Sequence, residues 1–83
     1  MKPIELKIAR VRKGLSRRDV ARTIGIAEST YGNKETGRTD FTAPEAVAVA
    51  ELLELTWDQY NDIFYDGTLP IGNMAGWSKE QSE

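Results

Sequence analysis

The stretch SRRDVARTIGIAESTYGNKETG, residues 16–37, indicates two short helices joined by a tight turn. Ser16 and Asp19 stand three residues apart at its start, a weak form of the capping box because Asp is shorter than the usual Glu or Gln. Gly25 supplies the backbone freedom that a sharp turn needs. The first helix carries one apolar face, which holds Val20, Ala21 and Ile24. A second helix is predicted over residues 28–36 and ends at a glycine.

This pattern resembles the helix-turn-helix of the phage repressor and Cro family, the Xre-type DNA-binding domains. The residues that stand at the family's spacing are Ser16, Ala21, Gly25, Ile26, Tyr31, Glu35 and Gly37. The resemblance covers roughly residues 4–65. It implies an all-α fold, a compact five-helix lambda-repressor-like domain, in which the second helix of the motif reads DNA.

Length and composition restrict the function further. The chain has 83 residues, with no cysteine and no histidine. Such a chain is expected to form one domain with a small core. Without cysteine it has no disulfide or thiolate chemistry, and without histidine it lacks the commonest general base and zinc ligand. Because it also has no phosphate-binding glycine loop and no metal-ligand cluster, we predict that it is not an enzyme and needs no cofactor or metal.

The sequence contains no membrane signal. No apolar run approaches the ~20 residues of a membrane-spanning helix. The first residues, MKPIELKIARVRKG, are charged throughout and differ from a signal peptide. We therefore expect a cytoplasmic protein without a membrane partner.

The net charge of -2 conceals an asymmetry along the chain. Residues 1–39 hold ten Lys and Arg against four Asp and Glu, a net charge of +6. Residues 40–83 hold one Lys against nine Asp and Glu, a net charge of -8. The first half is a plausible phosphate-facing surface, and DNA would repel the second half. The alternative is two solvated faces whose asymmetry arose by chance.

The helix before the motif is predicted over residues 4–13, after Pro3. Its apolar residues do not form one clean stripe, and Ile8 and Val11 are expected to be partly exposed. The resemblance implies a structural ion pair between Arg10 and Glu35 that braces the two helices against each other. Two independent surface charges are the alternative.

The helix over residues 28–36 is the candidate for base recognition. Opposite its apolar side, one face carries the predicted base-reading residues Glu28, Ser29, Gly32 and Asn33. The resemblance implies that this face enters the major groove. There, Glu28 can accept from a cytosine amino group, and Asn33 can pair with adenine through two hydrogen bonds.

The residues around this face are expected to contact phosphates. They are Arg17, Arg18, Lys34, Thr36, Arg38 and Thr39. For Lys34 we expect the methylene stem to cover the core while the ammonium group reaches a phosphate. Gly32 lies mid-helix, where glycine costs about 1 kcal/mol relative to alanine. It either permits close approach of the backbone to DNA or merely weakens the helix.

Two further helices complete a DNA-binding domain over residues 1–67. Each is expected to begin with a capping box. Thr42 pairs with Glu45 in the first box and Thr56 with Gln59 in the second, three residues apart in each case. The apolar face of the fourth helix holds Ala46, Val49, Ala50 and Leu53. The corresponding residues of the fifth helix are Trp57, Tyr60, Ile63 and Phe64.

Residues 68–83 are predicted to form an irregular C-terminal tail for interaction or dimer docking. Its apolar residues Ile71, Met74 and Trp77 are expected to dock on the same or a neighbouring subunit. We place the interface of a homodimer on the fifth helix and this tail, although Trp57 and Tyr60 are expected to complete the monomer core.

We predict a sequence-specific, double-stranded-DNA-binding transcriptional regulator of the phage repressor or Cro kind. It would bind a palindromic operator as a dimer. The alternative is a protein-interaction module on the same fold, such as an anti-repressor, a repressor partner or an antitoxin. That module would bind a phage or host protein through its acidic half or its tail. A steep salt dependence of DNA affinity distinguishes the two functions.

Overall fold

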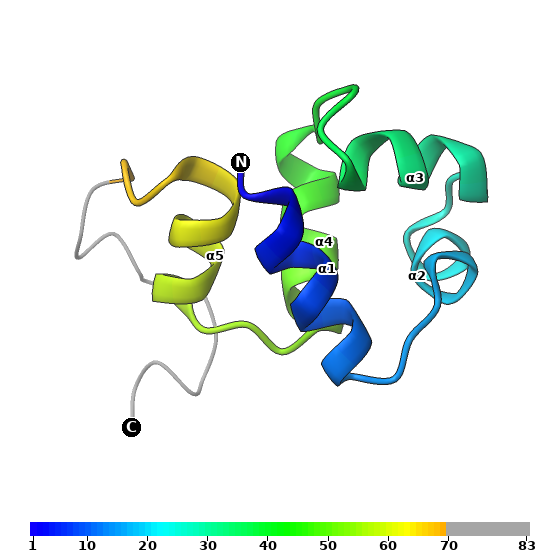
Figure 1. Cartoon of the computed structure of the whole chain (residues 1–83), viewed down its shortest axis with the longest axis horizontal. Helices are drawn as coiled ribbons and strands as arrows, with labels where there is room; N and C mark the ends of the chain where they lie inside the picture. Colours follow the sequence, from blue (N-terminus) through cyan, green and yellow to red (C-terminus); the bar gives the residue numbers. More distant parts are fainter. Residues whose placement is uncertain (70–83) are drawn as a thin grey trace.

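The computed structural model describes residues 1–69, which form five α-helices and no strand. The helices are α1 (Pro3–Arg12), α2 (Arg17–Ile24), α3 (Glu28–Glu35), α4 (Ala43–Leu52) and α5 (Trp57–Tyr65). None of these helices is long and apolar enough to span a lipid bilayer. In Figure 1, α1 and α4 lie in the middle, with α2 and α3 on one side and α5 on the other. The predicted all-α, five-helix architecture is confirmed, while the tail residues Ile71, Met74 and Trp77 lie outside the described part of the chain.

Capping boxes fix the beginnings of three helices, as the sequence predicts. In the box that begins α2, Ser16 Oγ accepts from the Asp19 N–H at 3.0 Å, and the Asp19 carboxylate accepts from the Ser16 N–H at 2.9 Å. The bonds from Ser16 hold the pKa of Asp19 below its usual value. Thr42 and Thr56 form the same reciprocal bonds at the beginnings of α4 and α5. Each cap satisfies backbone N–H groups that a helix leaves without partners.

The turn between α2 and α3 depends on Gly25. This residue has a φ of 84°, in the left-handed region that side chains disfavour. Its N–H donates to the carbonyl of Ala21 at 2.9 Å and so closes the end of α2. The chain then turns back at the half-buried Ile26 and enters α3.

All five helices contribute to one hydrophobic core. Its buried members are Leu6, Val20, Ala21, Tyr31, Ala46, Val49, Ala50, Leu53, Leu55, Trp57, Tyr60, Ile63 and Phe64. Phe41, from the loop before α4, connects α3 and α5 within this core. The centre of its ring lies 6.0 Å from that of Tyr31 in α3 and 5.3 Å from that of Phe64 in α5. Trp57, Tyr60, Ile63 and Phe64 of α5 are thus buried inside the monomer. The homodimer interface expected on this helix and the tail stays a prediction.

Candidate nucleic-acid interface

Helix α3 lies along the edge of the molecule beside α2 (Figure 1). Two residues one helical turn apart hold it there: Tyr31 and Glu35 are 0% and 1% exposed. On its other side, Glu28, Ser29 and Asn33 are exposed. The helix therefore presents a polar face to solvent from a rigid support.

The exposed face of α3 lines an open groove of about 500 Å³. The lining residues are Arg17, Glu28, Ser29, Gly32, Asn33, Thr36 and Arg38. The structure thus brings all four predicted base-reading residues together with three of the residues expected to contact phosphates. Two others, Arg18 and Thr39, are exposed but do not line this groove.

Glu35 is the centre of a buried hydrogen-bond network that positions the groove. Its carboxylate accepts from Arg10 Nε at 2.6 Å, from Arg17 Nε at 2.8 Å and from the Tyr31 hydroxyl at 3.0 Å. Arg10 Nη1 also donates to the carbonyl of Leu15 at 2.7 Å. One carboxylate therefore connects α1, the beginning of α2 and α3 through charge-assisted hydrogen bonds.

The surroundings of Glu35 keep it ionised. Burial opposes its charge, but the hydrogen bonds from Arg10, Arg17 and Tyr31 together outweigh burial and hold the pKa of Glu35 below its usual value. Burial and the neighbouring Glu35 raise the pKa of Tyr31, whose hydroxyl stays protonated and donates. At neutral pH the network contains one carboxylate between two guanidinium groups.

The close fit between Arg17 and Gly32 is a feature that sequence reasoning missed. A Cβ atom at position 32 would lie 3.3 Å from Arg17 Nη1, so the guanidinium group packs against the bare backbone of α3. The Arg17 side chain is still 40% exposed and lines the groove. An arginine at the beginning of one helix and a glycine in the middle of the next were the available signals. The sequence alone does not show that these two residues are in contact, because the contact depends on how α2 and α3 pack.

Lys34 does not have the predicted role. Its ammonium group donates to the carbonyl of Asp40 at 2.8 Å and lies 2.9 Å from the Glu45 carboxylate. The side chain is 12% exposed, so the ammonium group is directed toward the loop and α4. The prediction of a phosphate contact is wrong because the ammonium group is already paired with a carboxylate in the first turn of α4. Lys34 instead ties α3 to α4.

Replacing Gly32 with alanine is expected to weaken nucleic-acid binding without unfolding the protein. The new methyl group would displace the Arg17 guanidinium by a few tenths of an ångström and narrow the groove. Alanine favours the helix by about 1 kcal/mol, which offsets the crowding. For a DNA duplex that the protein selects from a randomised library, we expect the Kd to rise about threefold to tenfold, with Tm unchanged or higher.

The matched control for Gly32→Ala is Thr30→Ala, at an exposed α3 position outside the groove lining. Fluorescence anisotropy measures the Kd, and thermal melts measure the Tm. Equal affinity of both variants and the wild type would show that the fit of Arg17 against Gly32 has no part in binding.

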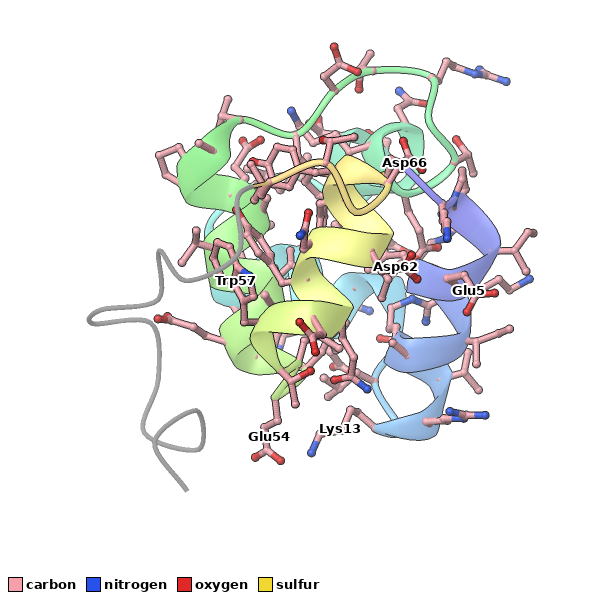
Figure 2. The ribbon with its side chains drawn as sticks, turned by 90° about the vertical axis from the view of Figure 1, so that its left-hand side faces the viewer. Glu5, Lys13, Glu54, Trp57, Asp62 and Asp66 are labelled. Atoms are coloured by element: carbon pink, nitrogen blue, oxygen red, sulfur yellow. The ribbon has the colours of Figure 1, made fainter. Side chains whose placement is uncertain are left out.

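Outside the groove along α3, two basic residues of the first half form ion pairs with the acidic half. Lys2 Nζ lies 2.6 Å from Asp62, and Lys13 Nζ lies 2.7 Å from Glu54. Figure 2 shows Glu54 beside Lys13, and Asp62 on the side of α5 that faces α1. The basic residues that line the groove are instead Arg17 of α2 and Arg38 of the loop after α3.

A family model described as a helix-turn-helix domain matches residues 4–60. The match begins in α1, includes α2, Gly25 and α3, and ends within α5. No curated protein and no solved structure is significantly similar to the chain. Since the match spans more than half of the 83 residues and contains the helix pair that builds the groove, the chain belongs to the helix-turn-helix domain family.

Proposed function

We propose that this protein binds double-stranded DNA in a sequence-specific manner and acts as a small transcriptional regulator of the phage repressor or Cro kind. The observation that carries the proposal is the groove along α3, where Glu28, Ser29, Gly32 and Asn33 share one open face. In a helix-turn-helix domain the second helix of the motif lies in the major groove.

The chemistry of this face suits base edges. The Asn33 amide can donate to N7 and accept from the amino group of one adenine, and the Glu28 carboxylate can accept from a cytosine amino group. Ser29 can donate or accept. Gly32 adds no side chain to this face, and its backbone leaves room there for the Arg17 guanidinium group.

Phosphate contacts would fix the domain on the duplex. The proposed set is Arg17, Arg18, Thr36, Arg38 and Thr39, without Lys34. Arg17 and Arg38 line the groove near α3, so they can reach the phosphates that border the major groove. Because Glu35 holds Arg17 in place, little side-chain entropy is lost when it binds.

The eight residues of α3 can read only a few base pairs. We therefore propose that two copies bind a palindromic site whose half-sites lie about one helical turn apart.

The test is selection of the purified full chain on a library of randomised duplexes, followed by affinity measurements at several salt concentrations. We expect an inverted repeat with half-site centres about 10 base pairs apart, and an affinity that falls steeply with salt. No enriched sequence and no salt dependence would reject DNA binding in favour of a protein-interaction module such as an anti-repressor or antitoxin.

Replacing Arg38 with alanine is expected to lower the salt dependence of DNA binding. Loss of one phosphate contact should reduce the slope of log K against log salt by about 1, to a similar extent for specific and random duplexes. The control is Arg22→Ala, which removes an exposed cation of α2 that does not line the groove. Identical slopes for the two variants would contradict a phosphate contact by Arg38.

A further inference from the structure

The outward face of α1 carries an apolar stripe that the monomer core does not use. It consists of Ile4, Ile8 and Val11, which are 68%, 40% and 56% exposed. Their spacing of four and three residues places them on one helical face, which we call the α1 stripe. None of them lines the groove along α3, so both surfaces are available at the same time.

Opposite charges border the α1 stripe. Glu5 and Arg12 are seven residues apart, two helical turns, and therefore lie on the same flank of the stripe. Lys7 lies on the other flank. All three are exposed side chains.

A shallow groove of about 110 Å³ runs beside this flank, between α1 and α5. Its lining includes Ile8, Ala9, Leu55 and Ile63, together with Glu5 and Arg12. In Figure 2, α1 lies next to α5 at the outer edge of the molecule, with the labelled Glu5 on its exposed side. The stripe therefore combines a ridge of apolar side chains with an adjacent depression of mixed polar and apolar lining, which also includes Gln59 and Asp62.

We propose that the α1 stripe is the contact surface for a second copy of this chain, packed antiparallel about a two-fold axis near Ile8. Such an axis reverses the direction of the second helix but leaves its charged flank on the same side. It therefore brings Glu5 of each copy opposite Arg12 of the other, so the surface is complementary to itself. The two Lys7 side chains lie near the axis on the other flank, where both are exposed and can turn away from each other into solvent.

The small area of the stripe determines the strength of this contact. Three side chains and a shallow groove cover less than the ~800 Å² per partner of a stable interface. The dimer should therefore be weak in solution and gain strength when one duplex holds both copies close together. This contact would join the two copies that we propose to bind one palindromic site, so its role rests on the proposed function. The contact itself can be measured without DNA.

The test is sedimentation equilibrium of the full chain, without DNA, over a range of protein concentrations. We expect a monomer–dimer equilibrium whose Kd rises about tenfold or more in Ile8→Asp, since the contact would then bury a charge. Thr30→Asp introduces the same charge at an exposed α3 position and should leave the Kd unchanged. Circular dichroism checks that both variants fold.

Charge reversal tests the antiparallel arrangement. Glu5→Arg and Arg12→Glu should each raise the Kd about tenfold, because each places like charges together twice. An equimolar mixture of the two variants should associate again, because every charged pair in the heterodimer is then attractive.

Three outcomes overturn the inference: a chain that stays monomeric, a dimer that tolerates Ile8→Asp, and variants that fail to associate on mixing. The first would show that no surface of the full chain self-associates without DNA, and the second would place the contact on another face. A failed DNA selection leaves these measurements untouched, so the two proposals fail separately.

Discussion

Replacing Glu35 with glutamine is expected to lower the free energy of unfolding by about 3–5 kcal/mol. Glutamine keeps the volume of the side chain but removes the charge that Arg10 and Arg17 share. The Arg10 side chain is 9% exposed, so its guanidinium group would stay buried without a counter-ion. Urea denaturation measures the loss. The control is Glu51→Gln, at an exposed position of α4, which should change stability by less than about 0.5 kcal/mol.

The same variant should change how stability depends on pH. Because the folded-state pKa of Glu35 lies below its ordinary value of 4.5, the stabilisation is complete above pH 4.5 and is lost as the pH falls through the folded-state pKa. Wild-type stability should therefore decline more steeply in acid than that of Glu35→Gln. Asp19 and Glu45, whose pKa values are also lowered, remain in both proteins. Parallel acid profiles would contradict a stabilising ionised Glu35.

Replacing Asn33 with alanine is expected to raise the Kd for the selected duplex by about tenfold to a hundredfold. A bidentate contact between an amide and adenine discriminates by about 1–3 kcal/mol, and truncation removes both hydrogen bonds. Since Asn33 is exposed and has no place in the core, Tm should not change. The Kd for random duplexes should differ from that of the wild type by less than about twofold, because phosphate contacts supply most of the affinity for such duplexes.

Thr30→Ala is the matched control for Asn33→Ala, because it truncates an exposed residue of the same helix outside the groove lining. The measurement is anisotropy with the selected and with random duplexes. A uniform loss on all sequences would assign Asn33 to the DNA backbone, and no loss at all would remove it from the interface.

Much of the fold could be predicted because local chemistry determines it. The three capping boxes each involve residues three positions apart, and the spacing of apolar residues along α4 and α5 marks their buried faces. The exposed face of α3 follows from the same periodicity once Tyr31 is placed inside. These features depend only on neighbours within about two helical turns.

The features that could not be predicted depend on neighbours distant in sequence. Lys34 is directed away from the groove because Glu45 of α4 lies beside it, and the sequence alone does not show that proximity. Arg17 shares Glu35 with Arg10 because Gly32 leaves room for its guanidinium group. The contact between the Phe41 and Phe64 rings likewise joins residues that are distant in sequence.

The central claim is that α3 meets DNA with its exposed face. Amide chemical-shift mapping of the full chain, titrated with the selected duplex, tests it most directly. We expect the largest shifts at Ser29, Gly32, Asn33 and Arg38, and little change along α5. Large shifts confined to α5 or α1, with α3 unchanged, would contradict the claim.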